Sequence, residues 1–348
     1  MYSVYQHWDP LKVMSVGISY PPELYDYITN KKVREVFYQI ANETEQDYQN
    51  LIKLLNSFGV ETVRPDIDAM VDRAQYSIKN NQPVPGPWEM QPRDNSIMLG
   101  ETFYFLGNKK TNSSILSLIE KQGNQIEFPI DTGFEYMGMS VKMNAAMTTR
   151  IGKDLIVGTY QEEPGKYALS NLQKNLQSKL PNYRVKMMDT SGHTDGCFCP
   201  VVPGLILSIM QPYNYTENFP DWEIVYLPGE SWEKVQPFLT LKQKNQGKWW
   251  VPGQELNQDF TDYVESWMNH WVGYVEESVF DVNMIVVDKQ NVIVNGYNKT
   301  VFDAFSRHGV TPHICNFRHR YFWDGGLHCI TNDLHREGVM QDYFPGRG

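Results

Sequence analysis

The stretch VNMIVVDKQNVIVNGYNKTVFDAFSRHGVTPHICNF, residues 282–317, predicts one complete folding unit. Its apolar segments 282–287 and 292–295 flank a polar turn, a pattern that is typical of a β-hairpin. Apolar side chains at helical spacing follow in residues 301–308, and Gly309 stands where a helix C-cap is expected. Residues 311–317 then return to an extended pattern. The predicted order is strand, strand, helix, strand.

Similar units recur through the chain, without a sequence repeat of fixed length. Turn residues are spread evenly and no long linker interrupts them, which favours one domain over residues 1–348. Five units of this kind predict an α/β fold, a pseudo-symmetric α/β propeller. The other units are expected at strands 96–99, 102–106 and 125–130 with helix 113–122; at strands 145–149, 154–159 and 183–188 with helix 167–180; at strands 197–202, 205–210 and 223–227; and at strands 13–17 and 62–64 with a helix within 31–58 and a strand after Cys329.

The composition excludes several classes of protein. A net charge of −10 argues against nucleic acid as the main partner and is compatible with a cationic substrate. No apolar run reaches the roughly 18 residues that a membrane helix needs, so we expect no membrane partner. The N-terminus does not read as a secretory signal, and four cysteines in 348 residues do not form a disulfide scaffold. A cytoplasmic protein with free thiols is therefore expected.

Three polar segments stand at expected junctions between loops and strands, where packing does not explain them. They carry Arg93 and Asp94, then His193 and Asp195, and finally Cys329 after a pair of glycines. A thiol is a good nucleophile when its neighbours favour the thiolate, and a histidine can act as general acid and base. Paired carboxylates hold a planar guanidinium through charge-assisted hydrogen bonds.

Each of these residues also has a structural interpretation. Cys329 could be a small buried hydrophobe, His193 a hydrogen-bonded turn residue, and Arg93 with Asp94 a surface ion pair of little consequence. A structural zinc site at His193, Cys197 and Cys199, with His328 or Cys329 nearby, competes as well. The C-x-C spacing is not the usual C-x-x-C of zinc knuckles, so we expect no metal.

Taken together, the motifs resemble those of glycine amidinotransferases of the pentein superfamily, the guanidino-group-modifying enzymes. Residues 325–333, GGLHCITND, resemble the nucleophile motif of that family, and residues 192–195, GHTD, its catalytic histidine motif. Residues 92–94, PRD, resemble its guanidinium-binding segment. Further likeness at 8–11, 59–66, 203–208 and 282–288 extends the resemblance over nearly the whole chain.

The resemblance implies a five-bladed pentein propeller of ββαβ units and an amidinotransferase that needs no cofactor. Cys329 would attack the guanidino carbon of arginine or a related donor, giving a covalent amidino-cysteine. His193 would protonate the leaving amine and then deprotonate the acceptor amine. Asp94, Asp195 and Arg93 would bind the substrate, so the partners are a small guanidino donor and an amine acceptor. A homodimer is one assembly that the family leaves open.

The chain departs from the family pattern at the carboxylate that normally pairs with the catalytic histidine. Asn144, in MNAAM at 143–147, occupies that position, and an amide cannot stabilise an imidazolium electrostatically. Glu135 is one acid that could substitute. The arginine that grips a substrate carboxylate also has no match around residues 210–213, and Glu276 and Glu277 stand where the family tends to have serines. An amine such as agmatine is therefore a hypothesis for the donor or acceptor.

Two other functions remain open on the sequence. An enzyme of the same fold could pass the amidino group to water, as an arginine-deiminase-like hydrolase does, and it would then release citrulline instead of ornithine. A non-catalytic pentein that only binds its ligand is the other reading, because fold does not dictate function.

Overall fold

The structure is a computed structural model that describes residues 1–136, 139–159, 166–190, 193–209, 215–227, 251, 253–254, 256–264 and 279–347. No helix in these residues is long and apolar enough to cross a membrane. All four cysteines are free thiols.

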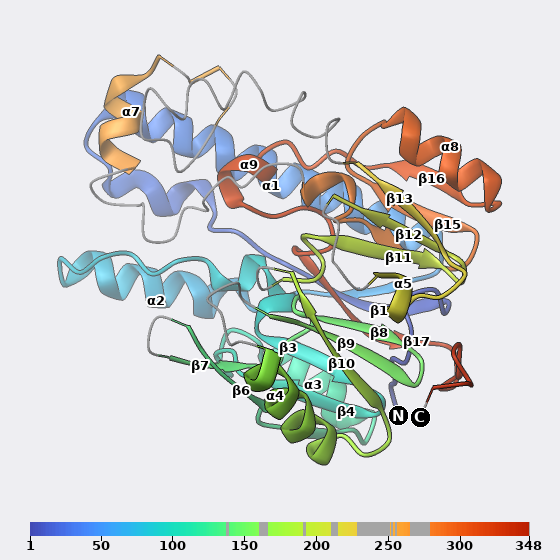
Figure 1. Ribbon diagram of the computed structural model, residues 1–348. Coiled ribbons are helices and arrows are strands. Elements are labelled where there is room, and N and C mark those ends of the chain that lie inside the picture. Colours follow the sequence, from blue (N-terminus) through green and yellow to red (C-terminus); the bar gives the residue numbers. More distant parts are fainter. Residues whose placement is uncertain are drawn as a thin grey trace.

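Five three-stranded sheets make up most of the fold (Figure 1). In each sheet the first two strands of a unit pair antiparallel, and the third pairs parallel with the second after a helical crossover. This order confirms the predicted strand–strand–helix–strand units. The units are β17 (Thr331–Arg336), β1 (Leu11–Val16), α1 (Lys31–Ser57) and β2 (Glu61–Val63); β3 (Ser96–Leu99), β4 (Thr102–Phe105), α3 (Ser113–Lys121) and β5 (Gln125–Glu127); β8 (Thr148–Ile151), β9 (Asp154–Thr159), α4 (Lys166–Lys179) and β10 (Arg184–Asp189); β11 (Phe198–Val202), β12 (Leu205–Ser208), α5 (Tyr215–Asn218) and β13 (Glu223–Tyr226); and β14 (Ile285–Val286), β15 (Asn291–Val294), α8 (Lys299–Arg307) and β16 (Thr311–Ile314).

Several elements lie outside these units or differ from the predicted bounds. The strand predicted at 145–149 begins at Thr148, because the Asn144 side chain accepts a hydrogen bond from the backbone N–H of Met147 and forms a turn there. The strand predicted at 282–287 shortens to Ile285–Val286. The additional elements are α2 (Ile67–Lys79), the hairpin β6 (Asp131–Tyr136) and β7 (Met139–Lys142), α7 (Gln258–Tyr263), α9 (Arg320–Trp323), and the 3-10 turns η1 (Pro22–Tyr27), η2 (Trp88–Met90), η3 (Pro92–Asp94) and η5 (Val279–Asp281).

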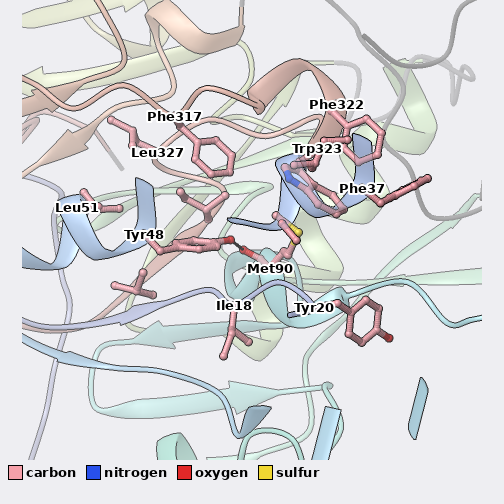
Figure 2. Packing of buried hydrophobic residues seen from close by; sticks show 14 of the residues in the cluster. Ile18, Tyr20, Phe37, Tyr48, Leu51, Met90, Phe317, Phe322, Trp323 and Leu327 are labelled. Atoms are coloured by element: carbon pink, nitrogen blue, oxygen red, sulfur yellow. Dashed lines mark hydrogen bonds between the residues drawn. The ribbon is translucent and has the colours of Figure 1, made fainter. Parts of the chain in front are cut away.

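The long helix α1 packs its apolar face into the largest core cluster. The Asn30 side chain caps its first turn by accepting from the backbone N–H of Lys32, and Gly59, with a φ of 76°, follows its end. Figure 2 shows Phe322 and Trp323 of α9 near Phe37 of α1. The indole N–H of Trp323 donates to the hydroxyl of Thr44 at 2.9 Å. This packing fixes the chain immediately before residues 324–329.

A buried carboxylate connects three of the sheets. Asp333 of β17 has no exposed surface and forms ion pairs with three arginines. The distances to its oxygens are 2.7 Å from Arg150, 2.8 Å from Arg336 and 3.2 Å from Arg93. Arg93 belongs to η3 and Arg150 to β8, so the turn before β3 and the strands β8 and β17 are held together at one point.

The three guanidinium groups keep Asp333 ionised. Burial alone would raise its pKa, but Arg150, Arg336 and Arg93 hold the pKa well below its usual value. A carboxylate with a depressed pKa stabilises the fold above its unfolded pKa, and this contribution is lost only as the pH falls through the folded value.

Replacing Asp333 by asparagine should therefore destabilise the protein strongly. Asp333→Asn keeps the shape of the side chain but leaves three buried guanidiniums without their counter-charge, which typically costs about 3–5 kcal/mol. Urea denaturation at neutral pH measures the free energy of unfolding. Asp303→Asn, which removes the exposed ion pair with Lys299, is the matched control and should cost less than about 1 kcal/mol. Equal small losses for both variants would contradict the role of Asp333.

Candidate active site

Residues that directly precede the first strand of each sheet meet at one place. Asn283, before β14, donates its side-chain N–H to Cys329 Sγ at 3.0 Å, and Cys329 lies shortly before β17. Asp195, before β11, has a carboxylate oxygen 3.5 Å from the same sulfur. The loop before β8 joins through Ala146, whose carbonyl accepts from the backbone N–H of Thr194 at 2.9 Å. Asp94, before β3, acts electrostatically on Cys329.

Cys329 is held by its backbone as well as by its side chain. The N–H of Cys329 donates to Asn283 Oδ1 at 3.1 Å, and the carbonyl of the preceding His328 accepts from Arg93 Nε at 2.8 Å. A Cβ on Gly325 would come 2.7 Å from Gln91 Nε2, and one on Gly326 would come 2.6 Å from Asn283 Oδ1. Gly326 is therefore required by the close approach of Asn283, whereas a side chain at Gly325 would displace the end of the Gln91 side chain.

The surroundings of Cys329 favour its neutral thiol. Burial raises its pKa well above the usual value, and the carboxylates of Asp195 and Asp94 raise it further. Hydrogen bonds from Asn283 and from the backbone of Gly326 act in the opposite direction. The sulfur therefore needs additional positive charge before it can act as a nucleophile.

The surroundings of His193 favour its charged form, in contrast to the surroundings of Cys329. Burial lowers its pKa, but the carboxylates of Asp94, Asp195 and Asp324 outweigh this effect and raise the pKa above its usual value. The carboxylates thus favour the imidazolium form more than in a free histidine, and this is the form that can give a proton to a leaving amine.

Asp94 and Asp195 each have one carboxylate oxygen that lacks a partner. Among the described residues, Asp94 Oδ1 and Asp195 Oδ1 are buried and accept no hydrogen bond. The other oxygen of Asp195 accepts from His328 Nδ1 at 2.9 Å. Burial raises the pKa of Asp94 to about 6, so it is largely ionised at neutral pH. Two unpaired anionic acceptors close to a thiol suit a ligand that brings several N–H donors and a positive charge.

His328 is a neutral residue of the site. Burial and the neighbouring Arg93 lower its pKa to about 4, in spite of the hydrogen bond to Asp195. Its Nδ1 therefore carries the proton and donates to the ionised Asp195, whose pKa the contact with His328 helps to lower against the effect of burial. His328 orients the Asp195 carboxylate.

Arg93 lies behind the Cys329 segment. Its side chain has no exposed surface, pairs with Asp333, and donates from Nε to the carbonyls of His328 and Thr331 at 2.8 and 2.9 Å. These contacts position the backbone around Cys329. The contact of Arg93 with substrate stays a prediction; among the described residues, its Nη1 and Nη2 are buried and have no hydrogen-bond partner.

Asn144 contacts its own turn and not the histidine. Its side-chain oxygen accepts from Met147 N–H at 3.0 Å. Among the described residues, the third carboxylate that acts on His193 is that of Asp324, which the sequence did not single out. The side chain of Glu135, the acid considered from the sequence, lies outside the described residues. Asp324 has a φ of 50° in the left-handed region and follows α9 directly. In the sequence, the only local feature that could have pointed to Asp324 as a site residue is its position directly before Gly325 and Gly326.

The zinc interpretation has no support in the described part of the chain, where no three metal-binding side chains cluster. Cys197 Sγ donates instead to the carbonyl of Thr190 at 2.9 Å. Burial raises the pKa of Cys199 to about 12, so this thiol stays protonated.

Comparison with known proteins finds amidinotransferases that are similar to this chain at low sequence identity. No protein-family model matches the chain. It is 21% identical over 397 residues to the mitochondrial glycine amidinotransferase of Xenopus laevis, covering 98% of this chain and 84% of that protein. It is 22% identical over 207 residues to the L-arginine:L-lysine amidinotransferase of Pseudomonas savastanoi pv. phaseolicola, covering 58% of this chain but only 46% of that protein.

A solved structure extends the comparison to the fold. The inosamine-phosphate amidinotransferase of Streptomyces griseus superimposes with a TM-score of 0.65 at 19% identity, covering 99% of both chains. The chain thus has the mixed α/β fold of that enzyme. The resemblance to amidinotransferases that the motifs indicated is confirmed.

We expect Asp324 to contribute to the charge state of His193 beside Asp94 and Asp195, and Asn144 to contribute nothing. In Asp324→Asn the pKa of His193 should fall, because one of its three carboxylates is lost; asparagine tolerates the left-handed backbone at this position. In Asn144→Ala the pKa of His193 should stay unchanged. A pH titration of the histidine ring ¹⁵N signals by NMR measures both. A larger fall in Asn144→Ala than in Asp324→Asn would contradict this assignment.

Proposed function

We propose that the protein transfers the amidino group of arginine, or of a related guanidino donor, to an amine acceptor through a covalent amidino-cysteine at Cys329. The observation that carries this proposal is the pair of buried, unpaired carboxylate oxygens of Asp94 and Asp195 beside that thiol. The sequence similarity to amidinotransferases along 98% of the chain supports the class of reaction.

The donor guanidinium would lie against Asp94 and Asp195. Its N–H groups would fill the two unpaired acceptors, and its positive charge would offset the carboxylates that keep Cys329 protonated. The thiol then loses its proton to water, and the thiolate faces the central guanidino carbon. The substrate itself thus supplies the charge that activates the nucleophile.

The first half of the reaction forms a carbon–sulfur bond and breaks a carbon–nitrogen bond. The thiolate attacks the guanidino carbon, and Asp94 and Asp195 stabilise the charge that remains on the amidino nitrogens. His193, as imidazolium, gives its proton to the leaving nitrogen, and the amine departs. Neutral His193 and an amidino-cysteine remain.

The second half reverses these steps with a different amine. Neutral His193 takes a proton from the acceptor, whose nitrogen attacks the amidino carbon. The carbon–sulfur bond breaks and the thiolate of Cys329 is released. In this scheme the carboxylate of Asp324 helps to stabilise the imidazolium form of His193. Asn144 cannot do so electrostatically, because its side chain carries no charge.

We also propose that the five sheets are the blades of a pentein propeller with this site at its centre. The convergence of the loops before β3, β8, β11, β14 and β17 supports that arrangement. The prediction of one domain over residues 1–348, the cytoplasmic location and the homodimer stay predictions. The agmatine hypothesis rests in part on residues 210–213, 276 and 277, which lie outside the described residues.

Mass spectrometry of the acid-quenched protein tests the covalent step. After mixing with arginine that carries a labelled guanidino carbon, the peptide containing Cys329 should gain the labelled amidino group, because the thiolate is the attacking atom. The peptides containing Cys197, Cys199 and Cys315 are internal controls and should stay unlabelled. In Cys329→Ser the label should disappear and turnover should fall by roughly 10³-fold or more.

The released product distinguishes transfer from hydrolysis. With an amine acceptor present, ornithine should accumulate and citrulline should not. Absence of label on Cys329 with both arginine and agmatine would refute the covalent mechanism, and accumulation of citrulline would assign the protein to the hydrolases instead.

A further inference from the structure

The side-chain amide of Asn283 has one defined orientation. Its Oδ1 accepts two backbone N–H groups, from His328 at 2.9 Å and from Cys329 at 3.1 Å. An amide nitrogen cannot accept hydrogen bonds from these donors, so the flipped rotamer is excluded. Nδ2 must then face the other way, toward the sulfur of Cys329.

The two N–H groups of Nδ2 each have an acceptor. Cys329 Sγ lies at 3.0 Å and the backbone carbonyl of Asp195 at 3.1 Å, with Asp195 Oδ2 farther away at 3.4 Å. One N–H is therefore directed at the sulfur while the other anchors the amide to the Asp195 loop. A donor fixed at both ends in this way loses no further conformational freedom when the sulfur becomes charged.

The surroundings hold this amide rigidly. Asn283 has no exposed surface, and Asn295 Nδ2 donates to its backbone carbonyl at 3.1 Å. Gly326 lies so close that a Cβ there would come 2.6 Å from Asn283 Oδ1. The glycine next to the nucleophile segment is thus matched to this asparagine.

We propose that Asn283 is a catalytic residue, whose Nδ2–H stabilises the thiolate of Cys329 when the guanidino donor binds and again when the amidino group leaves. This inference rests on the proposed role of Cys329 as nucleophile. In the resting thiol, the S–H can donate to Asp195 Oδ2 at 3.5 Å while Asn283 donates to the sulfur. Once the proton has left, the amide N–H remains directed at a full negative charge.

The charges around the sulfur make this donor necessary. Asp195 and Asp94 face Cys329 and oppose its ionisation, while Arg93 lies behind it and His193 shares the same two carboxylates. The neutral His328 ring donates to Asp195 and not to the sulfur. The hydrogen bonds that favour the thiolate come from Asn283 and from the backbone of Gly326.

The test is the rate at which iodoacetamide alkylates Cys329, followed by peptide mass mapping from about pH 7 to about pH 10, since only the thiolate reacts. Asn283→Asp keeps the acceptor for the two backbone N–H groups but removes the donor. We expect alkylation to be about ten- to a hundredfold slower than in the unmodified protein below the midpoint of the pH profile, because a hydrogen bond to a charged acceptor is lost. Because the pKa of Cys329 is raised well above its usual value, this range lies on the rising part of the pH profile, and each variant is compared with the unmodified protein at equal pH.

Asn283→Ala also removes the donor without adding charge, and should slow alkylation in the same direction. Asn291→Asp makes the same chemical change in β15, where the amide contacts Asp288 and His313 and not the site, and should leave the rate unchanged. If an Asn283 variant melts cooperatively, and is therefore folded, and its Cys329 is alkylated at a rate within twofold of that in the unmodified protein, the proposal is overturned.

If both Asn283 variants fail to fold, NMR of the protein with Asn283 intact tests the same proposal. The side-chain amide protons of Asn283 should shift in the NMR spectrum as Cys329 titrates, and should show no such shift in Cys329→Ser. Absence of the shift in the unmodified protein would equally overturn the proposal. Because alkylation and this titration need no guanidino substrate, they can succeed even if no amidino label ever reaches Cys329, so the two proposals fail separately.

Discussion

The buried carboxylate of Asp333 is the interaction on which the rest of the structure depends. Its three arginines come from η3, β8 and β17, so one charge ties together segments that are far apart in the sequence. Arg93 extends this contact to the carbonyls of His328 and Thr331, on both sides of Cys329 and Ile330. Removing the carboxylate of such a buried cluster leaves the guanidiniums without their counter-charge, so the position of the segment around Cys329 is tied to the stability of the core.

The site itself is left electrostatically incomplete. Asp94 and Asp195 present unpaired oxygens, and the neighbouring thiol is held in its neutral form by the same negative charges. Such an arrangement is unfavourable without a ligand and becomes favourable when a planar cation binds. In the proposed mechanism, the positive charge of the ligand accounts both for its selection and for the activation of Cys329, because a neutral ligand would not offset the charges of Asp94 and Asp195.

Much of this arrangement could be predicted from the sequence. The alternation of apolar residues and turn residues in 282–317 predicted a ββαβ unit, and sheet pairing confirms five such units. Cys329, His193, Asp94 and Asp195 were selected because polar residues at the start of apolar strands need a reason other than packing. The structure brings all four together, although their roles stay proposals.

The remaining features depend on contacts between segments that are distant in the chain. Asn283 precedes an apolar strand just as Asp195 does, yet its importance follows only from two backbone N–H groups 45 and 46 residues away. Arg93 reads as a ligand-binding residue beside Asp94, but its guanidinium points into the core because Asp333 is there. Asp324 is the third carboxylate that raises the pKa of His193, after Asp94 and Asp195, and its place beside a glycine pair does not distinguish it from an ordinary turn residue.

The measurement that most directly tests substrate-assisted activation is the ultraviolet absorbance of the thiolate at about pH 8, before and after addition of methylguanidinium. The difference between the unmodified protein and Cys329→Ser isolates the signal of this cysteine. Thiolate absorbance should appear as the cation binds, because the cation offsets the carboxylates of Asp94 and Asp195 that raise the pKa of Cys329. Bound cation, shown by a raised melting temperature, without any thiolate signal would contradict the account.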